Sequence, residues 1–232
     1  MFTKRKKITK KQIKEDKLVT SYYEAKTFYQ ENQSKILIGL GVIAFVIVAI
    51  IWYSNKSSEN NTLASVELNK VMPLYDSGAY QEAIDGKTGT NILGLKKIVD
   101  SYSGSENGEL ARIYLANAYY FLGKFDEALE NYEDYSGSNE LLTAAALAGT
   151  AACYEAKEKY EDAAHYYEKA FKVNEYNSQN AEYLLKAGAD YIKVQKFEEA
   201  QAAFDIIKEK YKTTQAFREL DRYLVLLPKE EL

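Results

Sequence analysis

The 232-residue sequence predicts an all-α protein in which a single N-terminal transmembrane helix precedes an α-solenoid. Three observations support this fold class. Residues 36–53 carry no charged side chain, and a pattern of aromatic and small residues recurs at intervals of 35 and 37 residues. The chain also has only 2 prolines, 1 cysteine and 1 histidine. So few prolines argue against many tight β-turns, and these cysteine and histidine counts exclude a disulfide framework and a zinc site of His and Cys ligands.

The uncharged run at residues 36–53 predicts a transmembrane helix. Its 18 residues would extend about 27 Å as a helix, close to the roughly 30 Å of hydrocarbon in a bilayer. Trp52 and Tyr53 lie at its end, where an interfacial aromatic belt is expected. A buried core helix is disfavoured because such helices seldom lack every polar residue. A cleaved signal peptide is disfavoured because the charged leader is too long and no small-residue cleavage site follows.

Residues 1–35 form a basic leader that predicts the membrane orientation. The leader has ten basic and four acidic side chains, whereas the remainder has 20 basic and 30 acidic ones. The positive-inside rule therefore places the leader in the cytoplasm and residues 54–232 across the membrane. In a bacterium this is a single-pass inner-membrane protein with a periplasmic C-terminal domain. The basic cluster at Lys4–Lys11 could also touch lipid headgroups or RNA phosphates, but a topology signal is sufficient, and no nucleic-acid partner is expected.

Apolar residues in the leader recur at near-helical spacing among charged neighbours. This pattern predicts a short amphipathic helix that lies on the cytoplasmic membrane face or docks a partner, and the sequence leaves both interpretations open. The residues are Ile13, Leu18, Val19, Tyr22, Tyr23, Phe28 and Tyr29.

The C-terminal domain contains a repeat. In each of three sets a tyrosine is followed after 6 residues by an aromatic residue, after 3 more by an alanine, and after 4 more by another aromatic residue. This spacing predicts pairs of antiparallel helices that bury their apolar faces only against neighbouring pairs, which is a solenoid. The sets are Tyr119, Phe125, Ala128 and Tyr132; Tyr154, Tyr160, Ala163 and Tyr167; and Tyr191, Phe197, Ala200 and Phe204. They follow the small residues Ala116, Ala151 and Gly188, and Gly123 lies in the first turn.

The repeat predicts the boundaries of four units and a cap. The units span about 107–138, 140–176 and 179–212, after a degenerate first unit over about 60–104, and a capping helix covers 213–228. In the first unit Gly78, Tyr80 and Ala83 reproduce the turn and the start of the second helix. Residues 84–91 then form a loop, and a helix follows over Leu93–Tyr102.

No motif in the sequence predicts an enzyme. The Gly86-Lys-Thr88 segment lacks the first glycine of a phosphate-binding loop, and no strand precedes it. His165 has no evident partner for catalysis, and the position of Cys153 favours core packing over redox chemistry. We therefore expect no catalytic residues, no cofactor, no metal and no small-molecule substrate.

The segment Leu115–Leu129, with the sequence LANAYYFLGKFDEAL, resembles the tetratricopeptide repeat, although the usual Trp and closing Pro are absent. The resemblance implies that the first helix of each unit lines a concave groove that binds peptides or helices of other proteins. Only Asn117 suits the family's carboxylate clamp, so acidic chaperone tails are not expected as ligands. Tyr120 and Phe121 could instead pack on the next pair or on the anchor. The implied groove residues are Ile113, Asn117, Tyr120, Phe121, Ala148, Ala152, Glu155, Leu185, Ala189, Ile192 and Lys193.

The complete layout resembles the bacterial membrane-anchored tetratricopeptide proteins that include the ancillary subunit of the Sec translocon. The likeness consists of the basic leader, the segment 28–35 leading into the span, Trp52 at its exit and a single repeat domain. It implies a scaffold that contacts the translocon or periplasmic chaperones and helps hand over secreted or envelope proteins. A scaffold for envelope assembly or cell division remains an alternative, as does an organelle import receptor whose repeats face the cytosol.

Overall fold

The computed structural model describes the backbone of residues 10–228 and the side chains of Lys17 and residues 19–228. Within these residues the secondary structure consists of helices α1 to α11 and one isolated bridge between Gly86 and Leu93, without a β-strand. The chain divides into two units at the junction of Lys56 and Ser57. The predicted all-α fold class is confirmed. Most of the basic cluster at Lys4–Lys11 lies outside the described residues.

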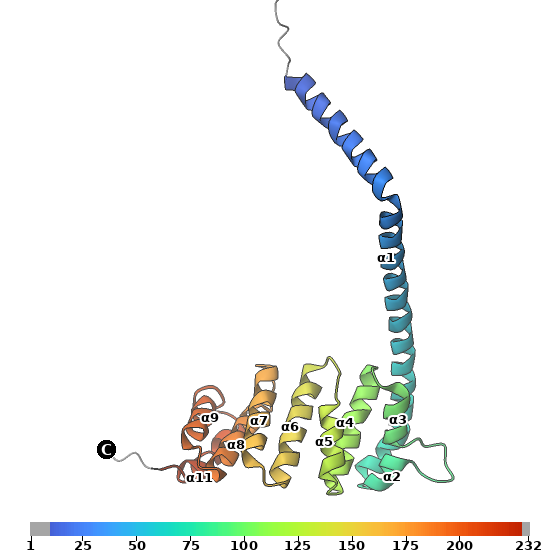
Figure 1. The fold of residues 1–232 in the computed structure, drawn as a ribbon. Coiled ribbons are helices and arrows are strands. Elements are labelled where there is room, and N and C mark those ends of the chain that lie inside the picture. The colour runs from blue at the N-terminus through green and yellow to red at the C-terminus, as the bar shows by residue number, and fades with distance from the viewer. Residues whose placement is uncertain (1–9, 229–232) are drawn as a thin grey trace, which may run out of the picture. The chain divides into compact units, whose positions relative to one another are not determined.

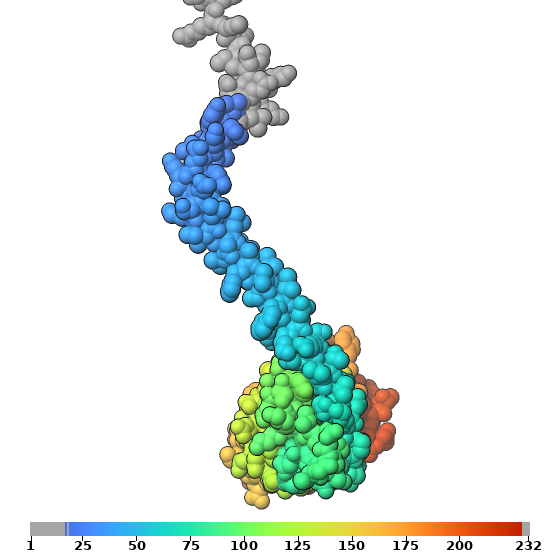
Figure 2. All heavy atoms as spheres, turned by 90° about the vertical axis from the view of Figure 1, so that its right-hand side faces the viewer, coloured from blue at the N-terminus to red at the C-terminus, as the bar shows by residue number. Residues whose placement is uncertain are grey.

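Helix α1 runs from Lys10 to Asp76 and contains the predicted span. No part of its most apolar window is buried in the structure, and Phe45 and Trp52 are 74% and 69% exposed. On the face drawn in Figure 2, no other segment of the described chain covers this part of α1. The core-helix alternative is therefore wrong, since a core helix is covered by protein. Helix α1 is a candidate single membrane span, in which lipid would cover the apolar side chains.

The amphipathic segment of the leader is part of α1 and not a separate helix. Tyr22, Tyr23, Phe28 and Tyr29 are all exposed along it. The described part of the leader contains neither proline nor glycine, so nothing in its sequence interrupts the helical hydrogen bonds. The side chains of Ile13 and Leu18 lie outside the described residues.

Residues 57–228 form an α-solenoid in which each helix packs against the next along the chain (Figure 1). The last part of α1 and α2 form the first helix pair, extended by α3, and α4/α5, α6/α7 and α8/α9 form the next three. The helices after α1 are α2 (Tyr80–Asp85), α3 (Leu95–Tyr102), α4 (Glu106–Phe121), α5 (Phe125–Glu133), α6 (Glu140–Ala156), α7 (Tyr160–Val173), α8 (Asn180–Lys193), α9 (Phe197–Lys210), α10 (Gln215–Glu219) and α11 (Asp221–Leu224).

The loop predicted over residues 84–91 begins later in the structure, because Ile84 and Asp85 still belong to α2. Two predicted helices also differ. The helix expected over Leu93–Tyr102 begins at Leu95, because Leu93 pairs with Gly86 in the bridge that closes the loop. The capping helix expected over 213–228 is divided into α10 and α11 around Leu220. Thr214 caps α10 by accepting a hydrogen bond from the backbone N–H of Phe217.

The solenoid core is built from the small and aromatic residues of the repeat. Ala128, Ala163 and Ala200 are fully buried. At Gly188 the contact is closest, since a Cβ atom there would lie 2.2 Å from the ring of Phe204. The ring of Tyr132 packs in the same way on Gly149, where a Cβ would lie 2.3 Å away, and the repeat pattern did not predict this second contact. The aromatic rings of second helices thus occupy the space that these first-helix positions leave free.

All four turns within the helix pairs have the same backbone geometry. In the second pair the N–H groups of Gly123 and Lys124 donate to the carbonyl oxygens of Tyr120 and Tyr119, both at 2.9 Å. This is the Schellman arrangement, which requires a left-handed residue after the helix. Gly78 and Gly123 supply that residue in the first two turns, with φ of 78° and 71°, whereas Glu158 and Gln195 adopt φ of 59° and 60° in the other two.

We expect Glu158→Gly and Gln195→Gly each to stabilise the protein. A left-handed conformation costs an L-residue about 1–2 kcal/mol, and glycine avoids this strain but loses more chain entropy on folding. The expected net gain is about 0.5–1 kcal/mol per site. Urea denaturation of the full chain in dodecyl maltoside micelles measures it. Gly123→Ala should destabilise the protein, and a loss of stability in the two glycine variants would contradict the strain argument.

Candidate protein-binding surface

The first helices α4, α6 and α8 form the candidate surface, which we call the first-helix face. Helix α4 contacts α6 directly, in addition to the contacts that each makes with α5. Ser105 and Asn139 cap the N-termini of α4 and α6 through their side-chain oxygens. The Schellman turns fix the opposite ends, so that the last residues of these helices are held in register.

Two residues predicted to line the groove do not belong to this face. Ile113 and Leu185 are only 6% and 2% exposed, so a bound partner could not touch them. They occupy equivalent positions in the repeat, and at both the helical periodicity turns the side chain toward the core. The other predicted residues are at least partly exposed, and Phe121 is 57% exposed. They are Asn117, Tyr120 and Phe121 on α4, Ala148, Ala152 and Glu155 on α6, and Ala189, Ile192 and Lys193 on α8.

Two further residues belong to the face and were missed. Tyr114 precedes Asn117 by three residues and Phe121 by seven, and Lys186 precedes Lys193 by the same seven. Both side chains are partly exposed. The spacing of three, four and seven residues along one helix was the available signal.

The N-terminal part of the face is aromatic. The ring of Phe121 stacks on Tyr80 of α2, with centroids 4.9 Å apart and an interplanar angle of 21°. Tyr80 contacts Tyr75 edge-on at 5.4 Å, and Tyr75 contacts Tyr114 at 5.1 Å. Phe121 therefore packs partly on the preceding pair and still exposes more than half of its surface.

Asn117 lies among these aromatic residues and is engaged within the protein. Its Oδ1 accepts a hydrogen bond from the hydroxyl of Tyr132. Burial raises the pKa of Tyr75 to about 12, and a hydrogen bond with Asn117 acts in the opposite direction. Asn117 is thus part of a tyrosine network within the protein.

The C-terminal part of the face is charged, with Lys193 at its centre. The Nζ of Lys193 lies 2.9 Å from Asp190 Oδ1, 3.6 Å from Glu155 Oε1 and 4.0 Å from the ring centroid of Tyr160. Glu155 Oε2 also accepts a hydrogen bond from the Tyr167 hydroxyl at 3.1 Å. Two carboxylates and an aromatic ring therefore surround one ammonium group.

Asp190 is the buried carboxyl group of this network. It is 1% exposed, and its Oδ2 has no hydrogen-bond partner. Burial raises the pKa of Asp190 to about 6. The negative charge of Glu155 adds to this increase, whereas the hydrogen bond from Lys193 and the positive charge of Lys186 act in the opposite direction. The native protein therefore holds the Asp190 proton to higher pH than the unfolded chain does.

Other candidates for chemistry stand apart from this face. Cys153 is fully buried, and burial raises the pKa of its thiol to about 12, so the thiolate needed for reaction is not formed near neutral pH. His165 is exposed, and its ring lies 6.3 Å from the neighbouring ring of Tyr166. In the described part of the chain, no group of three or more His, Cys, Asp or Glu side chains could hold a metal ion.

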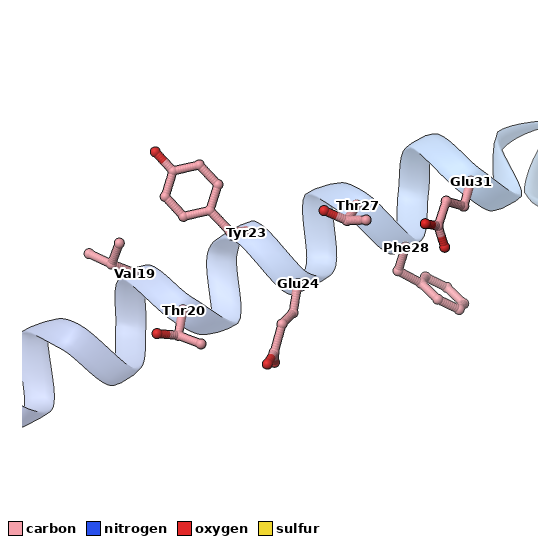
Figure 3. Close-up of a pocket in the computed structure, with 7 residues that line it drawn as sticks. All are labelled: Val19, Thr20, Tyr23, Glu24, Thr27, Phe28 and Glu31. Carbon is pink, nitrogen blue, oxygen red and sulfur yellow. The ribbon is translucent and has the colours of Figure 1, made fainter.

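Two hollows in the described part of the chain also lie away from this face. The hollow drawn in Figure 3, of about 540 Å³, runs along α1 from Val19 to Glu31. All seven lining residues come from one helix, and Tyr23 and Glu24 project to opposite sides of it, so the hollow is open to its surroundings. A larger cavity of about 1,160 Å³ lies between α9 and the segment of Leu227 and Pro228.

These features define a class of protein, an α-solenoid in a chain that also contains one candidate membrane span. Comparison with protein-family models, with curated proteins and with solved structures finds no match to the chain.

We expect Asp190→Asn to reduce the pH dependence of stability between pH 4 and 7. Asp190 has a native pKa of about 6 against a model value of 3.8. The cost of keeping Asp190 protonated in the folded protein vanishes well below pH 3.8, where the carboxyl group is protonated in both states. The cost grows as the unfolded chain ionises, reaching roughly 3 kcal/mol above pH 6.

The free energy of unfolding of the wild type should therefore fall by that amount relative to the variant as the pH rises through this window. Urea denaturation at several pH values measures the free energy of unfolding of both proteins. A difference between them that is the same at every pH does not affect the comparison. Parallel pH profiles would show that Asp190 ionises normally in the folded protein.

Proposed function

We propose that this protein is a non-enzymatic adaptor, anchored in a membrane by α1, whose solenoid binds other proteins through the first-helix face. The observation that carries the proposal is the exposed side chain of Phe121, on a face that continues with the small residues of α6 and the charged network of α8. Exposed aromatic groups next to polar side chains are typical of binding surfaces. The exposed apolar segment of α1 supports the membrane anchor.

The finer proposal is that the protein assists an inner-membrane translocon by handing secreted or envelope proteins to periplasmic chaperones. Its support is the resemblance of the layout to the membrane-anchored tetratricopeptide family. A scaffold for envelope assembly is the second candidate, because the same face would serve any extended or helical partner. An organelle import receptor is the third, and it requires the opposite topology.

Site-specific photocrosslinking in the native host tests the binding function. A photoreactive phenylalanine analogue placed at position 121 should capture a partner protein. The same analogue at position 176 is the matched control, because Tyr176 is 91% exposed but lies in the loop before α8. Mass spectrometry of the adduct separates translocon subunits or periplasmic chaperones from cell-wall enzymes. Absence of an adduct at position 121, or equal adducts at both positions, would contradict a binding role for this face.

Fusion reporters test the proposed topology, in which the N-terminus is cytoplasmic and the solenoid periplasmic. A reporter that is active only in the periplasm should be active when it is fused after Leu232. The same reporter fused after Lys35 should be silent, because the basic leader stays in the cytoplasm. A silent fusion after Leu232 would place the solenoid in the cytosol and favour the import receptor.

A further inference from the structure

Two of the three junctions between helix pairs share a contact on the first-helix face. The residue that ends a first helix covers the ring that opens the preceding second helix. Phe121, at the end of α4, stacks on Tyr80 at the start of α2. Lys193, at the end of α8, places its ammonium group 4.0 Å from the ring centroid of Tyr160 at the start of α7.

The middle junction lacks this covering side chain. Ala156 ends α6 and corresponds to Phe121 and Lys193, and Phe125 at the start of α5 corresponds to Tyr80 and Tyr160. Ala156 is exposed and Phe125 is partly exposed. A methyl group cannot cover an aromatic ring as a phenyl ring or a lysine side chain does.

Adjacent contacts show that the middle junction is assembled like the other two. Lys157, which follows Ala156, forms an ion pair with Asp126, which follows Phe125. In the other two junctions the residue after the ring also pairs with a lysine, Gln81 with Lys124 at 3.0 Å and Glu161 with Lys196 at 2.7 Å, but these lysines lie three residues after the end of the first helix. In all three junctions a lysine beyond the end of the first helix thus binds the residue after the ring, and in the middle junction the covering position holds only a methyl group.

We propose that the Phe125 ring receives a basic side chain, arginine or lysine, from a partner protein, in the position that Lys193 fills over Tyr160. This inference rests on the proposed binding function of the face and names the chemistry of the partner. The precedent is within the chain, since Lys193 is held by a ring and two carboxylates. Of those carboxylates, Glu155 directly precedes Ala156 and is partly exposed.

Charge complementarity favours a basic partner over an apolar or acidic one. Residues 57–228 carry 28 acidic and 18 basic side chains, so the domain attracts cations. An aromatic face gains from a cation above it, and arginine can stack on the ring while its guanidinium pairs with a carboxylate. The ring of Tyr120 lies 5.4 Å from that of Phe125 and forms a second aromatic wall.

A peptide titration with the full chain in dodecyl maltoside micelles tests the inference. The probe is a fluorescein-labelled peptide of alternating arginine and serine, and the comparison peptide has citrulline in place of arginine. Ala156→Lys should weaken binding of the arginine peptide about fivefold or more, because its own side chain would cover the ring. Ala202→Lys makes the same charge change at an exposed position of α9 and should change the dissociation constant less than about twofold.

A second variant removes the aromatic face without filling the site. Phe125→Leu keeps an apolar side chain and should weaken arginine binding about threefold or more, while circular dichroism verifies the helical fold. Equal binding by Ala156→Lys and Ala202→Lys, wild-type binding by Phe125→Leu, or equal affinity for the citrulline peptide would each overturn the inference. If photocrosslinking at position 121 still captures a partner, such a result overturns only the basic chemistry of the site and leaves the binding function standing.

Discussion

The contact between an aromatic ring of a second helix and a small residue of a first helix determines the geometry of the solenoid. At Gly188 the ring of Phe204 occupies the volume where a Cβ would lie, and at Gly149 the ring of Tyr132 does the same. Since neither position tolerates a side chain without displacing a ring, the separation of the helices is fixed there. The repeated turns fix the ends of the first helices, and the two constraints together decide which residues point outward.

Because packing restricts the inward positions and leaves the outward ones free, the same repeat can present aromatic, small and charged side chains on one face. The inward positions are occupied by alanine, glycine and aromatic residues, because packing requires them. The last residue of each first helix carries no such requirement, and it is phenylalanine in α4, alanine in α6 and lysine in α8. The face changes accordingly from aromatic to small to charged along the solenoid, while the backbone arrangement stays the same.

The features that the sequence predicts best are those in which core packing or the surrounding medium restricts the choice of residue. The candidate membrane span was predicted from an uncharged run of helical length, and the repeat residues were predicted from the spacing that the core imposes. The groove was predicted less well, because the register taken from the family included Ile113 and Leu185, which this chain buries. Asp190 carried no signal, since its surroundings come from α6, α7 and α8 and its neighbours in sequence do not reveal them. Gly149 was missed because the other units have larger residues at its position.

The loop between α2 and α3 is where this solenoid tolerates changes in chain length. Gly86 and Leu93 form an antiparallel bridge that holds the two ends together, and the residues at 87–91 between them are exposed. Lengthening such a loop adds only a small closure entropy, about 0.6 kcal/mol for each doubling. The extra residues that separate the first unit from the regular repeat therefore have little effect on the stacked pairs. The same loop is a suitable insertion point for an epitope tag or a fluorescent domain on the otherwise closely packed repeats.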